Sequence, residues 1–174
     1  MSARPAFSVI STVFFVIAGL FCIAVPFVSD SLLSNLFIGR MLLLCGFLHG
    51  INLFTTREPW RFVRRIPPVV VPIIIAFLIF LNDGIHARSL TVMLMIFFIL
   101  DGYSKIVASL ESGTRRVGKV AMVSAALSFF LAIYLAATFP AAPLPVLALF
   151  LGVDIISMGL TNFPSRVAFE TRNL

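Results

Sequence analysis

The segment LLLCGFLHGINLFTTREPWRFVRR, residues 42–65, contains the pattern that decides the fold. Its apolar part carries two polar side chains, His49 and Asn52, and it then gives way to a stretch with four arginines. A spacing of three places the two polar groups on one face of a helix. The segment therefore predicts an apolar helix that has a polar stripe and ends at a basic boundary.

The composition of the whole chain indicates an integral membrane protein. Of the 174 residues, 60% are hydrophobic and 11% are charged, and the mean hydropathy is +1.11. Ordinary soluble domains are about one-quarter charged, so this chain would present too much apolar surface to water. One transmembrane helix needs about 20 mainly apolar residues, and the chain is long enough for several.

Six apolar runs predict six transmembrane helices in a single domain, residues 1–174. The runs cover residues 7–28, 32–54, 67–81, 89–110, 119–139 and 144–163. Short turn-forming stretches separate the first run from the second, the third from the fourth and the fifth from the sixth. Because short turns join antiparallel neighbours, we predict an all-α membrane protein built as three tandem helical hairpins, at approximately 7–54, 67–110 and 119–163.

The third run is short for a membrane-spanning helix. Pro67 and Pro68 suit the first positions of a helix, where no backbone donor is needed. The helix is therefore expected to begin at this pair and to end at Leu81 or to extend to Ile85.

Basic residues predict the orientation of the helices in the membrane. Most of the 13 Lys and Arg residues precede the first run or follow an even-numbered run, whereas Arg88 lies in a turn on the other side. The former are Arg4, Arg57, Arg61, Arg64, Arg65, Arg115, Arg116, Lys119, Arg166 and Arg172. Since positive residues stay on the cytoplasmic side, both termini are expected there.

The net charge of +6 is explained by this topology and by anionic lipid headgroups. No folded motif for nucleic-acid binding occurs, so membrane lipids and not nucleic acid are the expected partners. Trp60 lies among arginines at the basic end of the second run, where aromatic and basic side chains anchor helices at the membrane surface. The predicted interface anchors are Trp60, Arg57, Arg61, Arg64 and Arg65.

The even-numbered runs share a repeated polar motif. Superposing them aligns His49 with Asp101 and Asp154, and three positions later Asn52 aligns with Ser104 and Ser157. In each copy an ionisable residue and an amide or hydroxyl lie on one helix face, ahead of a basic cytoplasmic end. This repeat supports three tandem two-helix units.

This repeat is accompanied by the G-x-x-x-G of GFLHG and by the segments LDGYSKIVASLE and LGVDIISMGL. In these features the chain resembles the HdeD-like bacterial inner-membrane proteins. The resemblance extends over nearly the whole chain. It implies a six-span inner-membrane protein associated with acid resistance and other envelope stress. It supplies no catalytic or ligand-binding residue to transfer to this sequence.

Ionisable residues within the apolar runs are the strongest candidates for a functional site, because charges deep in lipid are energetically costly and usually face the interior of a bundle. Asp101 and Lys105 are four residues apart and can pair on one helix face. One interpretation is a proton or cation relay of Asp101 and Asp154, assisted by His49. The other is an internally neutralised Asp101–Lys105 pair, with Asp154 hydrogen-bonded to a neighbouring helix. In that case replacing Asp101 would leave Lys105 unpaired.

Arg40, well inside the second run, completes the candidate polar network. Its side chain is expected either to extend outward to the membrane surface or to pair with Asp154 or Asp30. The predicted network comprises His49, Asn52, Asp101, Ser104, Lys105, Asp154, Ser157 and Arg40.

The chain lacks the sequence motifs of common enzymes. No G-x-S-x-G, P-loop, G-x-G-x-x-G or H-E-x-x-H pattern occurs, and no cofactor or metal site is expected. We therefore expect a non-enzymatic membrane protein. The alternatives are an accessory subunit that packs against a larger membrane complex, and a proton-coupled carrier that uses Asp101 and Asp154. The protein partners considered are further copies of the chain, in a homo-oligomer, or a larger membrane protein complex.

Overall fold

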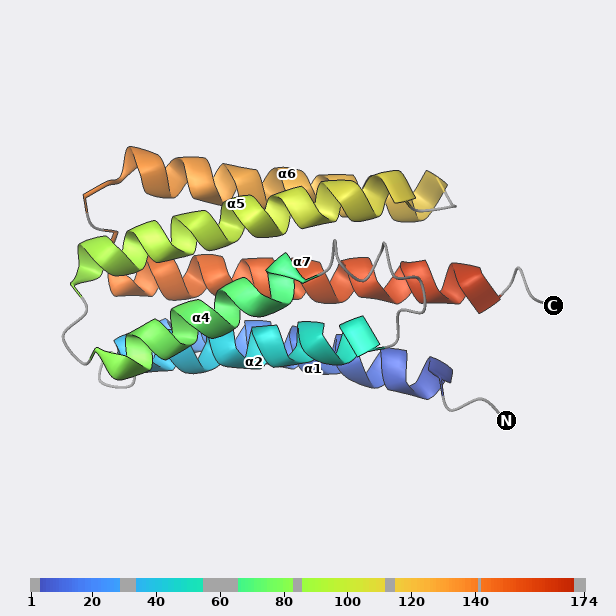
Figure 1. Ribbon diagram of the computed structural model, residues 1–174, viewed down its shortest axis with the longest axis horizontal. Coiled ribbons are helices and arrows are strands. Elements are labelled where there is room, and N and C mark those ends of the chain that lie inside the picture. Colours follow the sequence, from blue (N-terminus) through green and yellow to red (C-terminus); the bar gives the residue numbers. More distant parts are fainter. Residues whose placement is uncertain are drawn as a thin grey trace.

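The computed structural model of the chain describes residues 4–28, 34–54, 66–82, 86–111, 115–140 and 142–170, with side chains at 12–28, 34–50, 66–82, 86–110, 117–140 and 142–161. These residues form six α-helices (Figure 1). They are α1 (Arg4–Val28), α2 (Asn35–Phe54), α4 (Pro67–Leu81), α5 (Ala87–Glu111), α6 (Arg115–Ala137) and α7 (Leu144–Glu170). The predicted all-helical fold is confirmed, and each helix coincides with one predicted apolar run.

The helices have the composition of membrane-spanning segments, although they differ in length. Over the described side chains, three are long and apolar enough to cross a membrane: Ala87–Leu110, Val117–Ala137 and Leu144–Thr161. Three further apolar stretches are shorter: Thr12–Val28, Asn35–Gly50 and Pro67–Leu81. The chain is thus all-helical, and three of the described helices are long and apolar enough to cross a membrane. A crossing by all six helices stays a prediction.

Helix α4 begins at the predicted proline pair, with Pro67 and Pro68 in its first positions. It ends at Leu81, because Asn82 has φ −131° and ψ 83°, outside the helical region. The expected extension to Ile85 is therefore wrong. With 15 residues, α4 is about 22 Å long, shorter than the hydrocarbon core of about 30 Å.

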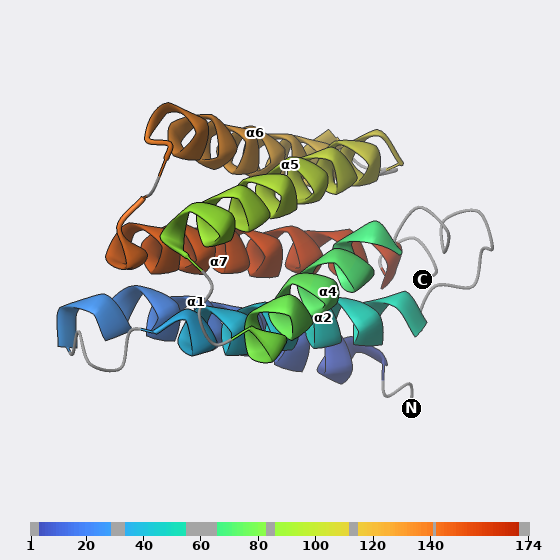
Figure 2. The ribbon, with the colours of Figure 1, turned by 60° about the vertical axis from the view of Figure 1, so that its left-hand side comes forward.

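The six helices form a closed ring of contacts. Each helix contacts its neighbours in the chain, and α1 packs against α7 to close the ring (Figures 1 and 2). Extensive and smaller interfaces alternate around the ring: α2–α4, α5–α6 and α7–α1 are extensive, and α1–α2, α4–α5 and α6–α7 are smaller. Two helices of one predicted hairpin thus contact each other less than they contact the neighbouring hairpins.

Glycines allow close approach at each of the three extensive interfaces. A Cβ atom on Gly19 of α1 would lie 2.7 Å from the carbonyl oxygen of Gly152 on α7, so the two backbones are in contact there. A Cβ atom on Gly46 would lie 2.6 Å from Ile73 of α4, and one on Gly102 would lie 3.0 Å from an aromatic ring of α6. Small residues of this kind let helices pack closely in membranes, where packing contributes much of the stability.

Apolar side chains occur both inside the ring and on its outer surface. Large buried side chains come from several helices: Phe15, Leu42, Ile79, Phe97, Leu135 and Leu151. Each helix also exposes large apolar side chains, such as Phe14, Phe47, Phe77, Ile96, Ile133 and Leu160. The bundle thus has an apolar interior and also exposes apolar side chains on every helix.

Candidate functional site: a buried cluster of charges

Three charged side chains meet in the interior between α5 and α7. The ammonium nitrogen of Lys105 lies 2.5 Å from Oδ2 of Asp101, one turn earlier on α5, and 2.7 Å from Oδ1 of Asp154 on α7. Asp154 is fully buried, and Asp101 and Lys105 are only 1% and 6% exposed. One lysine therefore pairs with two carboxylates, one on its own helix and one on another.

Serine hydroxyls surround this ion pair. The Lys105 ammonium donates hydrogen bonds to Ser128 of α6 at 2.9 Å and to Ser157 of α7 at 3.0 Å. The Ser128 oxygen also lies 2.7 Å from Oδ1 of Asp154, and the Ser124 hydroxyl donates to Ser157 at 2.9 Å. Because an ammonium has only three hydrogens, its four oxygen neighbours share them, which ties three helices together.

The polar residues face inward because of their spacing along three helices. Each helix contributes two polar side chains three or four residues apart, and this spacing places both on one face. The pairs are Asp101 and Lys105 on α5, Ser124 and Ser128 on α6, and Asp154 and Ser157 on α7. We call these six residues the charge cluster.

The charge cluster has one more acidic than basic group. Two carboxylates face one ammonium, and Oδ1 of Asp101 and Oδ2 of Asp154 have no hydrogen-bond partner within the described part of the chain. A net charge is expensive to bury in a medium that cannot solvate it. The cluster is electrically neutral when one of the two carboxyl groups carries a proton.

The structure brings together four residues of the predicted network: Asp101, Lys105, Asp154 and Ser157. Lys105 neutralises Asp101, as one of the two interpretations requires, but the same lysine also binds Asp154. The Ser104 hydroxyl donates at 2.8 Å to the backbone carbonyl of Asp101, so it bonds within its own helix.

His49 packs against α7 and α1. Its Nε2 lies 3.1 Å from the sulfur of Met158, and its ring is 5.6 Å from that of Phe15, edge to face. Cys45, one turn earlier, donates to the same sulfur at 3.5 Å. Met158 directly follows Ser157 of the cluster on α7. Participation of His49 in a relay stays a prediction.

Arg40 has an exposed side chain on α2. Since Asp154 is paired with Lys105, the arrangement favours an outward-pointing Arg40 over an Arg40–Asp154 pair. The other proposed partner, Asp30, lies outside the described residues. The side chain of Asn52 is likewise not described, and the predicted interface anchors Trp60, Arg57, Arg61, Arg64 and Arg65 lie outside the described residues.

Sequence reasoning missed the contribution of α6. Ser124 and Ser128 are four residues apart in an otherwise apolar helix, and their common face was the available signal. In the described ranges, no three His, Cys, Asp or Glu side chains are grouped so that they could hold a metal ion.

The chain matches one family model in two segments, residues 10–66 and 70–137. The model describes a short repeat of unknown function, DUF308. No curated protein and no solved structure matches the chain. The first segment contains most of α1 and all of α2, and the second contains most of α4 with α5 and α6. Because the two segments cover more than half of its length, the chain belongs to the DUF308 family of short-repeat proteins.

Proposed function

We propose that the protein is a non-enzymatic, HdeD-like component of the bacterial inner membrane that acts in envelope or acid stress. The charge cluster is the observation that carries this proposal. Its two carboxylates share one lysine inside the bundle, so uptake of one proton brings the cluster to neutrality. A bundle held together in this way keeps its interior charge balanced when the surroundings become acidic.

The proposed location and orientation rest on the distribution of basic residues. Both ends of the chain and the segments after α2, α5 and α7 would face the cytoplasm, and the intervening turns would face the periplasm. The apolar outer surface of the helices would contact lipid.

A second candidate function is proton-coupled transport through Asp101 and Asp154. This function is favoured by Oδ1 of Asp101 and Oδ2 of Asp154. Neither oxygen has a hydrogen-bond partner among the described residues, so both are available to bind a proton. A carrier must expose its carboxyl groups to each side of the membrane in turn, whereas here Asp154 is fully buried and Asp101 is 1% exposed. The packed arrangement therefore supports a stabilising role better than a transport role.

Proton flux into reconstituted vesicles separates these two functions. We would compare the wild-type protein with Asp154→Asn, which leaves Asp101 and Lys105 as a one-to-one pair and removes one proton-binding group. We expect no specific flux under a pH gradient from either protein. Robust proton flux with the wild-type protein that disappears in the folded variant would establish the transport role and refute the stabilising role.

Survival in acid tests the stress function itself. Source cells that lack the protein should survive an acid challenge less well than cells in which it is restored. Asp154→Asn should restore survival as well as the wild type, because one ammonium then faces one carboxylate and the cluster is neutral without an added proton. Equal survival with and without the protein would contradict the proposal. Purification in mild detergent tests the accessory-subunit alternative, since a constant companion protein would favour it.

A further inference from the structure

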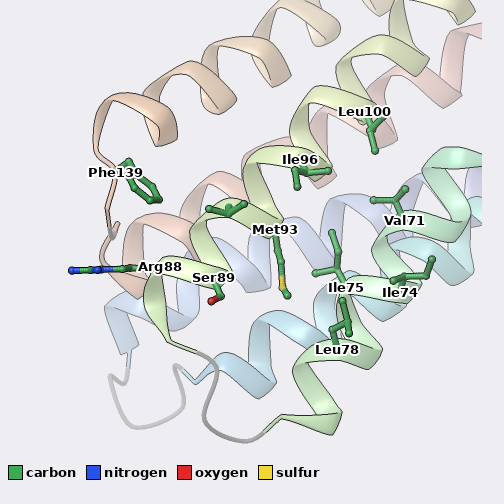
Figure 3. A pocket seen from close by; sticks show the side chains of 11 residues that line it. Val71, Ile74, Ile75, Leu78, Arg88, Ser89, Met93, Ile96, Leu100 and Phe139 are labelled. Carbon is green, nitrogen blue, oxygen red and sulfur yellow. The ribbon is translucent and has the colours of Figure 1, made fainter.

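A groove lies at the smaller interface between α4 and α5. It encloses about 590 Å³, within the range of small-molecule sites, about 300–1,000 Å³. Its lining is apolar except for Arg88 and Ser89 at one end (Figure 3). The lining residues are Val71, Ile74, Ile75, Leu78, Arg88, Ser89, Val92, Met93, Ile96, Leu100 and Phe139.

The groove opens to the outside of the bundle along its length. Ile74 and Leu78 of α4 and Ile96 of α5 are 53%, 44% and 46% exposed, although they line the cavity. Figure 3 shows the side chains of Ile75 from α4 and Met93 from α5 in the space between the two helices. An apolar ligand can therefore enter sideways from the surrounding lipid.

The length of the groove matches one leaflet of a membrane. From Arg88 to Leu100 the lining follows α5 for about 18 Å, at about 1.5 Å per residue. One leaflet supplies about half of the 30 Å hydrocarbon core, or about 15 Å. The groove thus has the length of one lipid chain that extends from the membrane surface to the midplane.

Arg88 supplies the charge at the surface end of the groove. It is the second residue of α5, its side chain is exposed, and no carboxylate pairs with it within the described ranges. A guanidinium binds phosphate oxygens with two parallel hydrogen bonds, and the neighbouring Ser89 hydroxyl is a further donor. A basic group at the mouth of an apolar groove is the arrangement that holds a lipid headgroup.

We propose that the α4–α5 groove binds one anionic glycerophospholipid, with an acyl chain along α4 and α5 and the phosphate held by Arg88 and Ser89. We assign a net negative charge to the lipid headgroup because Arg88 is the single charged residue of the groove lining. A zwitterionic headgroup would bring its own ammonium next to the guanidinium. The bound chain would fill the gap between two helices that contact each other little.

Native mass spectrometry of the full-length protein tests this site. Protein freed of lipid in detergent would be titrated with phosphatidylglycerol, and bound lipid per chain would be counted. We expect one tightly bound lipid, about tenfold weaker binding for Arg88→Gln because a hydrogen bond to a charged group is lost, and no tight binding for Ile96→Trp, which fills the groove.

Two matched variants control for general effects of charge and size. Arg40→Gln removes an exposed arginine from α2, and Ile133→Trp enlarges an exposed isoleucine on α6, so both should bind lipid like the wild type. The thermal unfolding of every variant would be measured to confirm that each one is folded.

Several results would overturn the proposal. Equal binding by Arg88→Gln, Ile96→Trp and the controls would place the lipid elsewhere. Equally tight binding of phosphatidylethanolamine, or displacement of the lipid by inorganic phosphate alone, would contradict an anionic lipid anchored by its chain. A lipid-free dimer that Ile96→Trp dissociates would assign the groove to a second copy of the protein.

Discussion

Lys105 and Asp154 are 49 residues apart, yet the lysine nitrogen lies 2.7 Å from a carboxylate oxygen of the aspartate. They belong to α5 and α7, which share few other contacts. The pair therefore connects two helices that the ring otherwise links mainly through α6.

Replacing Lys105 by methionine should destabilise the protein strongly. The change leaves two buried carboxylates without their cation, and removal of one partner from a buried ion pair costs about 3–5 kcal/mol. The free energy of unfolding in detergent would be compared with that of Lys119→Met, which removes an exposed lysine from α6. A loss no larger than that of the control would show that Lys105 does not balance the cluster.

Asp101→Asn should lower the free energy of unfolding much less than Lys105→Met does. The sequence alone suggested that this change strands an unpaired lysine, but the structure supplies Asp154 as a remaining partner. One ammonium then faces one carboxylate, and the cluster is neutral without an added proton. Unfolding measured side by side should rank Lys105→Met as the more damaging change, and the reverse order would argue against a shared lysine.

Ser128→Ala should lower stability by about 1–2 kcal/mol. The hydroxyl accepts from Lys105 and lies within hydrogen-bonding distance of Asp154, so its removal weakens three-helix contact at the cluster. Ser104→Ala is the matched control, since it deletes the same atom from a hydroxyl that bonds its own helix. Similar unfolding free energies for the two variants would contradict a linking role for Ser128.

Gly152→Ala should disrupt the α1–α7 interface by about 1–3 kcal/mol. The new Cβ atom would lie 2.7 Å from the carbonyl oxygen of Gly19, and a backbone atom cannot easily move away. Gly50→Ala should change stability little, because its Cβ atom would meet Val69 at an ordinary 3.6 Å. Thermal unfolding of the two alanine variants checks this contrast, and equal midpoints would count against the close approach.

Reporter fusions should show whether the short helix α4 crosses the membrane. A fusion at Arg64 is expected to report the cytoplasm and one at Gly84 the periplasm, because the two positions flank α4. Fusions at Asp30 and Ala142 should give the periplasmic signal and one at Gly113 the cytoplasmic signal. The same signal from Arg64 and Gly84 would mean that α4 does not cross.

The positions of the helices were predictable because each depends on local sequence. Apolar length located the runs, and the proline pair at Pro67 and Pro68 gave the start of α4. The pairing of Asp101 with Lys105 could be predicted for the same reason, since it lies within one helix. Partners on different helices depend on how the helices pack, which periodicity does not reveal.

This difference explains what was missed at the charge cluster. Asp154 was identified as costly to bury, but its partnership with Lys105 depends on the placement of α7 beside α5. Ser128 carries no charge, so the search for ionisable residues within apolar runs did not identify it or the contribution of α6. The repeat likewise indicated three similar units, yet it did not indicate that the closest packing is between units instead of within them.

Because α1 packs against α7, the chain could begin at another helix and still form the same ring of contacts. The beginning of α1 and the end of α7 lie at the same end of the bundle (Figure 1), and the α2–α4 interface is extensive, like that between α1 and α7. A circularly permuted chain that starts at α4, joins α7 to α1 and ends at α2 would keep every interface of the ring. Its new terminal helices would pack against each other as the present ones do.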